Sequence, residues 1–413
     1  MKKIFFQILL LSFIVISTIL ISCNKEEPKS ENRRFHYDGD GILVLNSKRT
    51  FIIGSYYLPN DENPFAELKK NGFNYIRAKA EKEQLDAANK NSLMTWIHVG
   101  SIKKDSEEKD KQHISEIIEQ YKTHPSVLCW EMEDEPAYTW NSAEARIEPE
   151  PLFKTSNFIR QLDKEHLIFT NHAPVNLIST MQKYNNTTDV VAVDVYPIVP
   201  HGITPSYALL PDGMQGDLLN TYPSQVGEYV EKMKKVVNNA KPIFAVLQGF
   251  AWELLKPEKE RTMDMVKFPT YLENRFMAYN AIVHGANGIV YWGWKYTPQP
   301  SEFMKNLYKV TTELAEMQDV LAAHTINLGI TKQYHELGFS VDTGVEILAK
   351  KVNDKIYLLT VNSDKNPVKI SLNGLSNYAK AKVLQENRTV DIHNGILTDT
   401  YKPFDVHIYY ISN

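Results

Sequence analysis

Short apolar runs alternate with amphipathic stretches through most of the chain after residue 50. Eight of these runs have the length and the β-branched and aromatic content of buried strands. Runs of this kind that alternate with helical stretches are typical of βα units, which build a parallel sheet. The eight expected strands span residues 51–57, 73–78, 93–100, 127–133, 167–171, 190–196, 242–250 and 288–294.

Amphipathic stretches fit between these runs as helices, and a final one follows the eighth strand. The repeating part covers about 270 residues, close to the ~250 typical of a (β/α)8 barrel. The alternative is a doubly wound open sheet, but no Gly-rich phosphate-binding pattern follows the first strand. We therefore expect a TIM barrel over residues 36–322, with helices that include residues 64–70, 111–122, 152–163, 225–239, 272–284 and 301–321.

Two β-rich segments flank the expected barrel. From Ile42 two apolar runs surround a polar turn, which predicts a β-hairpin that closes the barrel bottom. From residue 323 to residue 413, short alternating strands replace the helical stretches, with turn signals at Asn353-Asp354 and Asn394-Gly395. This pattern predicts a small antiparallel β-sandwich after the barrel.

Composition narrows the possible partners. The formal net charge of the 413 residues is -4, and Lys and Arg are scattered, so we expect no nucleic-acid partner. The chain has no zinc-ligand spacing, no Gly-x-Ser-x-Gly motif and no Walker loop. Metal, serine-hydrolase and nucleotide functions are therefore not expected, and no cofactor is implied.

The N-terminal segment resembles a bacterial lipoprotein signal. Two lysines precede an apolar run over residues 4–21, which ends in Leu20-Ile21-Ser22-Cys23. The resemblance implies that residues 1–22 are removed and that Cys23 carries the lipid anchor to the membrane. A membrane-spanning helix is the alternative, but the run is barely long enough for one.

A polar stretch over residues 23–35 is expected to form a flexible tether. Its Lys25-Glu26-Glu27 resembles the surface-export signal of Bacteroidetes lipoproteins, which implies an outer-membrane lipoprotein. Display at the cell surface is preferred, and the periplasmic face stays open. Only Cys129 remains after Cys23 is lipidated, so no intrachain disulfide is expected.

A dense run of acids lies at the end of the fourth expected strand. The segment Trp130-Glu131-Met132-Glu133-Asp134-Glu135-Pro136 places four carboxylates where a barrel strand opens onto the catalytic face. Acidic residues rarely occur inside strands without a partner or a function. For Glu131 and Glu133, structural ion pairs with Arg77 or Lys79 are an equally good interpretation.

The same segment resembles the large retaining clan of (β/α)8 glycoside hydrolases, in which an Asn-Glu-Pro motif ends the fourth strand. Glu135-Pro136 matches that motif, which implies that Glu135 is the general acid/base. Four further side chains have types that recur at strand ends in the clan, and the resemblance implies that they bind substrate: Arg77, His98, Tyr196 and Trp292. Glycosidic bond cleavage needs an acid for the leaving oxygen and a negative group for the oxocarbenium-like transition state.

Two positions depart from the clan. Asp134 stands where the clan has Asn, and an Asp-Glu pair resembles enzymes acting on N-acetylhexosamines, in which Asp orients the substrate acetamide. Gln248 ends the seventh strand, where the clan has its nucleophilic Glu. An amide cannot form the usual glycosyl ester, so the nucleophile stays open.

Three interpretations follow from Gln248. The nucleophile comes from elsewhere, with Asp194, Glu253 or Glu273 as candidates. Alternatively, catalysis is substrate-assisted, with support from Asp134 and Tyr196 while Gln248 binds sugar. The third interpretation is a barrel that has lost activity and only binds glycans.

Further side chains complete the expected site. Asn171-His172 ends the fifth strand, so His172 is expected to bind hydroxyl groups, although this pair can also cap the following segment. Tyr196 and Trp292 offer flat faces for a sugar ring. We expect a glycoside hydrolase that acts with retention on a neutral or acetamido glycan, and a surface glycan-binding lipoprotein is the alternative.

Overall fold

The computed structural model describes residues 33–139, 144–200, 202–203, 220–335, 338 and 340–412. The expected signal peptide, Cys23 and the tether up to residue 32 lie outside these residues. Among the described residues, no helix combines the length and the apolar character that crossing a membrane requires.

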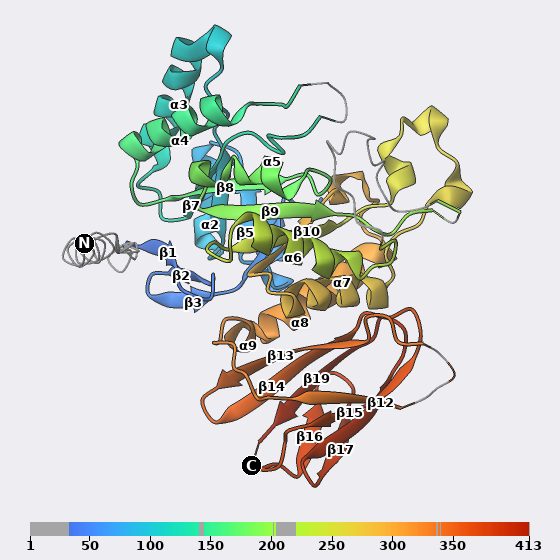
Figure 1. Ribbon diagram of the computed structural model, residues 1–413. Helices are drawn as coiled ribbons and strands as arrows, with labels where there is room; N and C mark the ends of the chain where they lie inside the picture. The colour runs from blue at the N-terminus through green and yellow to red at the C-terminus, as the bar shows by residue number, and fades with distance from the viewer. Residues whose placement is uncertain are drawn as a thin grey trace, which may run out of the picture. The chain divides into compact units, whose positions relative to one another are not determined.

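Eight parallel strands close into a barrel, which confirms the expected TIM fold (Figure 1). The last strand pairs with the first, with Gly288 beside Ile52, so an open sheet is excluded. Each strand is rich in Val, Ile and aromatic residues because it is covered on both sides. The barrel strands are β4 (Ile52–Ser55), β5 (Tyr75–Ala78), β6 (Met94–His98), β7 (Val127–Glu131), β8 (Leu167–His172), β9 (Val190–Val195), β10 (Ile243–Gln248) and β11 (Gly288–Trp292).

Aromatic side chains fill the interior of the barrel. Tyr75 stacks on Trp96 with 4.5 Å between ring centroids, and Phe169 and Phe244 lie 6.1 Å apart beside them. All four side chains are fully buried. The barrel interior is therefore a packed core, and the side chains available to a ligand lie at the end of the barrel where the strands finish.

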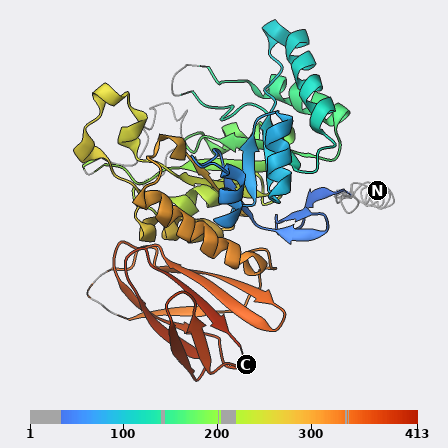
Figure 2. The ribbon, with the colours of Figure 1, turned by 180° about the vertical axis from the view of Figure 1, so that it is seen from behind.

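Helices cover the outside of the barrel, and α8 shows how their sequence places them. Phe303, Leu307, Val310 and Leu314 recur at helical spacing and are buried, while Ser301 caps the helix by accepting a hydrogen bond from the Met304 N–H. Figure 2 shows this long orange helix on the outer side of the barrel. The helices are α1 (Pro64–Lys70), α2 (Lys82–Lys90), α3 (Glu107–Tyr121), α4 (Pro149–Leu162), α5 (Ile178–Gln182), α6 (Gln225–Val236), α7 (Tyr271–Val283), α8 (Glu302–Glu316) and α9 (Gln318–Leu321).

The expected N-terminal hairpin is present and carries a third strand. Its turn residues Asn46 and Ser47 both have positive φ, the geometry of a tight two-residue hairpin. Phe35 and Leu43 pack into the same apolar cluster as the barrel interior, so this sheet covers the barrel bottom. Its antiparallel strands are β1 (Phe35–Tyr37), β2 (Leu43–Leu45) and β3 (Lys48–Thr50).

The expected C-terminal antiparallel domain is also present, and it has an apolar core of its own. Asn353 and Asn394, both with positive φ, form two of its turns as the sequence predicts. Its neighbouring strands run in the order β12-β15-β18-β17-β16-β19-β14-β13. They are β12 (Thr331–His335), β13 (Val345–Val352), β14 (Lys355–Asn362), β15 (Val368–Asn373), β16 (Lys380–Val383), β17 (Arg388–His393), β18 (Ile396–Tyr401) and β19 (Val406–Ile411).

Barrel helix α7 packs against the C-terminal domain. Val361 and Ile408 share an apolar cluster with barrel residues such as Phe276. Arg275 of α7 forms a buried ion pair with Glu313 of α8 at 2.8 Å. The same guanidinium donates to the Val406 carbonyl at 2.9 Å, so a single side chain connects two barrel helices to β19.

Candidate active site

The segment after β7 brings Glu135 to the open end of the barrel. Glu135 has a φ of 47°, an uncommon left-handed backbone conformation for a residue with a side chain. Its N–H donates to the Asn171 carbonyl at the end of β8, at 3.0 Å. This hydrogen bond holds the turn against the neighbouring strand. Residues with an uncommon backbone conformation, such as Glu135, concentrate at functional sites.

The Glu135 carboxyl is mostly buried, with 16% of its side chain exposed. Burial, followed by the nearby charge of Asp134, raises the pKa of Glu135 to about 7. Two neighbours lower the pKa of Glu135: the guanidinium of Arg146, which lies 2.9 Å from Glu135 Oε2, and the side chain of Asp194, which forms a hydrogen bond to Glu135. Glu135 therefore exchanges its proton close to neutral pH, as a general acid requires.

Asp134 and Asp194 complete a group of three interacting carboxyls with Glu135. Asp134 Oδ1 accepts a hydrogen bond from Asn171 Nδ2 at 3.1 Å, and burial and the charge of Glu131 raise the Asp134 pKa. Burial, Glu135 and Asp134 raise the Asp194 pKa well above its ordinary value. In addition to burial, the charge of Asp134 raises the pKa of Glu135, and the charges of both raise that of Asp194, so the three carboxyls do not titrate independently.

Glu131 forms a structural ion pair, one of the two interpretations the sequence leaves open. It is fully buried, and Arg77 Nε donates to its Oε2 at 2.8 Å. His98 Nδ1 lies 3.6 Å from the same oxygen. Glu133 instead lines a cavity of about 410 Å³ that His98 also borders.

A second cavity, of about 520 Å³, also has His98 in its lining. It is bordered by Arg77 and by the aromatic residues Tyr56 and Tyr57 from the segment after β4. Two cavities that share His98 at the strand ends provide room for a ligand larger than one small molecule.

Two aromatic side chains form a wall beside the carboxyls: Tyr196, directly after β9, and Trp292 of β11. Tyr196 and Trp292 stack with 5.6 Å between their ring centroids and 23° between their planes. Both rings keep some solvent exposure, whereas Trp294 is fully buried. Tyr196 and Trp292 are thus suited to contact a ligand, and Trp294 packs in the core.

Two residues expected to bind substrate have other surroundings. Gln248 is fully buried, and its amide exchanges two hydrogen bonds with the Ile198 backbone, at 2.9 and 2.8 Å, and donates to the Phe250 carbonyl at 3.0 Å. These bonds occupy the amide, which argues against a contact with sugar. His172 is also buried, and burial lowers its pKa to about 4, so it stays neutral behind the site.

The three candidate nucleophiles have different surroundings in the structure. Asp194 lies beside Glu135. Glu253 is held by Lys256 at 2.7 Å and by the Thr262 N–H at 2.7 Å, so it stabilises the loop after β10. Glu273 closes a capping box with Thr270 at the start of α7. Of the three candidates, only Asp194 lies with Glu135 and Asp134.

Sequence reasoning missed Arg146. It lies in the loop between β7 and α4, where no periodic pattern marks it, and it also donates to the Asp134 carbonyl at 2.9 Å. Its guanidinium covers the Tyr138 ring at 5.0 Å. Across the ranges that the structure describes, no cluster of three His, Cys, Asp or Glu side chains is arranged to hold a metal ion.

Comparison with protein families finds no match to this chain, and comparison with curated protein sequences finds none either. Solved structures share the fold. An α-amylase from Geobacillus thermoleovorans complexed with acarbose has a TM-score of 0.56 at 8% identity, covering 92% of this chain and 99% of that one. An Anoxybacillus α-amylase has a TM-score of 0.55 at 8% identity, covering 91% and 99%. The enzyme AmyP, solved with maltose, has a TM-score of 0.54 at 7% identity, covering 87% and 96%. At these identities the likeness shows the fold alone: this chain shares its architecture with α-amylases.

Proposed function

We propose that the protein is a glycoside hydrolase in which Glu135 is the general acid. One observation carries this proposal. A carboxyl whose pKa is raised to about 7 stands at the open end of the barrel, in contact with a second carboxyl, Asp194. A group that is partly protonated near neutral pH can donate a proton to the leaving oxygen of a glycosidic bond.

Asp194 is our candidate for the group that stabilises the oxocarbenium-like transition state. The pKa values of Asp194 and Asp134 are also raised. A proton can therefore pass between these carboxyls and Glu135, and the negative charge then moves to the carboxyl that has lost the proton. When Glu135 gives its proton to the substrate, the site gains a negative charge beside the sugar carbon. Asp194 is hydrogen-bonded to Glu135, closer than the ~5–5.5 Å that separates the two carboxyls of retaining enzymes, so attack by Asp194 would require the two side chains to separate when substrate binds.

Substrate assistance is the second mechanism. Asp134 is fixed by Asn171 and Arg146 next to the proton donor, a suitable position for orienting an acetamide group. In either mechanism the stacked pair Tyr196 and Trp292 would support the apolar face of a pyranose ring. The identity of an accepted sugar distinguishes the two mechanisms, because only an N-acetylhexosamine can supply its own nucleophile.

We further propose that the substrate is a neutral or acetamido glycan of the cell envelope or its surroundings. This rests on the small net charge and on the lipoprotein-like signal ending at Cys23, which would hold the enzyme on the outer membrane.

The test is hydrolysis of a panel of aryl glycosides and oligosaccharides, N-acetylhexosaminides among them, by the wild-type chain and by Glu135→Gln and Asp194→Asn. Glu150→Gln is the matched control because its carboxyl lies on α4 and is 79% exposed. We expect Glu135→Gln and Asp194→Asn to lose activity by at least ~100-fold and the control to keep it.

Turnover that survives in Glu135→Gln would refute its role as the acid. If no glycan is cleaved while the wild-type chain and Glu135→Gln bind glycans equally well, the protein is a surface glycan-binding lipoprotein and the hydrolase proposal fails. Proton NMR of the first product formed from an accepted substrate reports retention or inversion directly.

A further inference from the structure

A cavity of about 460 Å³ lies between the first turn of α7 and the C-terminal domain. Its other wall comes from β17, β18 and β19 and the turns between them. Strand β10 ends at the open end of the barrel, and α7 begins after the connecting segment, so the first turn of α7 lies at that same end. The cavity therefore borders the rim of the barrel face that carries Glu135.

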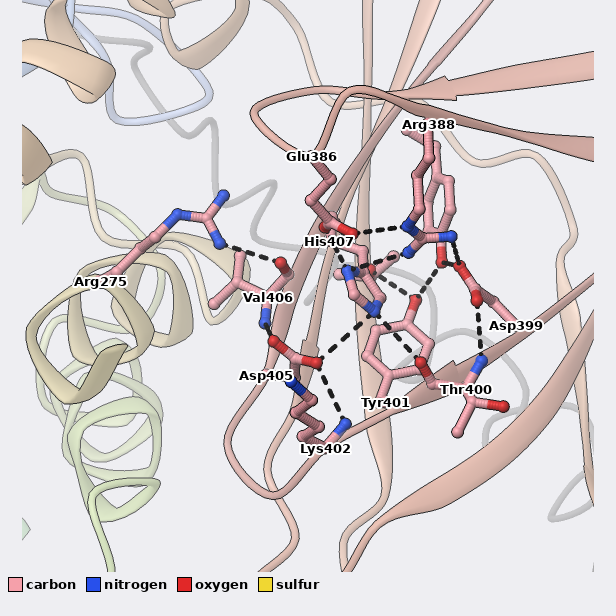
Figure 3. A network of polar contacts seen from close by, with 12 residues as sticks. Arg275, Glu386, Arg388, Asp399, Thr400, Tyr401, Lys402, Asp405, Val406 and His407 are labelled. Atoms are coloured by element: carbon pink, nitrogen blue, oxygen red, sulfur yellow. Dashed lines mark hydrogen bonds and ion pairs between the residues drawn. The ribbon is translucent and has the colours of Figure 1, made fainter. Parts of the chain in front are cut away.

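Charged side chains form a connected network on the wall from the C-terminal domain (Figure 3). Arg388 donates from Nε to Glu386 at 2.6 Å and from Nη1 to Asp399 at 2.8 Å. The His407 ring contacts Glu386 through Nδ1. Asp405 accepts from the Lys402 N–H at 3.1 Å, which fixes the turn that ends at the cavity.

Buried hydroxyl groups hold this network in place from behind. Tyr409 donates to Asp399 at 2.8 Å, and the Tyr401 hydroxyl lies 2.9 Å from that of Tyr409. Thr360 Oγ1 extends the chain, 2.7 Å from the Tyr401 hydroxyl. The three side chains are fully or almost fully buried. The charged groups are thus orientated before any ligand arrives, which is the usual construction of a binding site.

The charges that line the cavity balance. Glu386, Asp399 and Asp405 supply three negative charges, and Arg275, Arg388 and Lys402 supply three positive charges. An anionic ligand would meet the three carboxylates, and a cationic ligand would meet the three bases. A neutral ligand rich in hydroxyl groups can instead donate to the carboxylates and accept from the bases.

The opposite wall, from α7, is mainly apolar. Tyr271 and Leu272 line the cavity beside Arg275, and Leu272 is 63% exposed. An apolar wall facing fixed polar groups matches a sugar ring, which has a face of C–H groups and a periphery of hydroxyls. The cavity volume lies in the range of ~300–1,000 Å³ typical of small-ligand sites.

We propose that this cavity is a second carbohydrate site, which binds a neutral saccharide between Tyr271 and Leu272 of α7 and the Arg388 network of the C-terminal domain. This second site is separate from the three carboxyls at Glu135, and the proposal does not require those carboxyls to be catalytic. Its place at the rim suits a second segment of the same glycan chain.

The test measures binding by the full chain in detergent, with Glu135→Gln as the parent so that no probe is consumed. The probes are neutral starch, xylan, galactomannan and β-glucan and anionic polygalacturonate, in affinity gels, followed by titration calorimetry with an oligosaccharide of the retained polymer. We expect retention by a neutral polymer, and binding about tenfold weaker in Leu272→Asp, ~1.4 kcal/mol.

Lys402→Ala provides a milder second variant, with Lys382→Ala as its matched control. Both lysines are exposed in the C-terminal domain, but Lys382 does not line the cavity. We expect a loss with Lys402→Ala and none with Lys382→Ala, at unchanged thermal stability.

Three results would overturn the proposal. These are no retention by any neutral polymer, retention by polygalacturonate alone, and equal binding by the parent, Leu272→Asp and Lys402→Ala. Loss of hydrolysis in Glu135→Gln bears only on the proposed function, because the binding measurement starts from that variant.

Discussion

Replacing Glu135 by Gln should stabilise the protein, by an amount that grows as the pH rises from 4.5 to about 7. Burial and Asp134 raise the pKa of this carboxyl from 4.5 to about 7. The native state therefore holds the proton more tightly than the unfolded state. The resulting contribution to the free energy of unfolding is fully present below pH 4.5 and is lost as the pH rises through 7. At ~1.4 kcal/mol for each tenfold change in proton affinity, the loss amounts to about 3 kcal/mol.

The variant keeps the shape of the side chain but has no charge to bury. The gain in stability of Glu135→Gln over wild type should therefore be near zero at pH 4.5 and rise to about 3 kcal/mol at pH 8, which corresponds to a Tm gain of roughly 3–4 °C for a chain of this size. The assay is thermal unfolding of both proteins at half-unit steps of pH. Glu150→Gln, exposed on α4, controls for surface charge and should show no such trend.

A stability difference that does not change between pH 5 and pH 8 would refute this reasoning. So would a variant that is less stable than wild type at pH 8, because Arg146 would then stabilise the charged carboxyl by more than burial destabilises it.

Three further predictions concern activity and packing. Activity should fall about tenfold per pH unit above pH 7 as Glu135 loses its proton; a flat profile from pH 6 to pH 9 would contradict its acid role. Gln248→Glu should not create a nucleophile and should cost ~3 kcal/mol in chemical denaturation, because a carboxylate would face backbone carbonyls; an active, equally stable variant would disprove this. Arg275→Met should cost ~3–5 kcal/mol by leaving Glu313 buried and unpaired, and adding Glu313→Gln should recover part of the loss; equal stability of Arg275→Met and wild type would contradict it.

The barrel was predictable because its signals are local. A strand covered on both sides must be apolar throughout, so each of the eight strands stood out as a run, and all eight are confirmed. Helix α2 was not among the helices named from the sequence, because its pattern is weak and only Leu85 and Ala88 are buried. Strand β1 was missed for a similar reason, since only Phe35 of its three residues is buried.

The sequence by itself determined the barrel, its flanking β-segments and the position of the acidic run, because apolar periodicity and neighbours along the chain set those features. Only the tertiary structure decided how the acids divide: Glu131 pairs with Arg77, while Asp194 of β9 joins Glu135. It also decided that Gln248 is occupied by backbone groups. Contacts of this kind depend on which strands are neighbours around the barrel and on irregular loops such as the one carrying Arg146, and no periodic pattern encodes either.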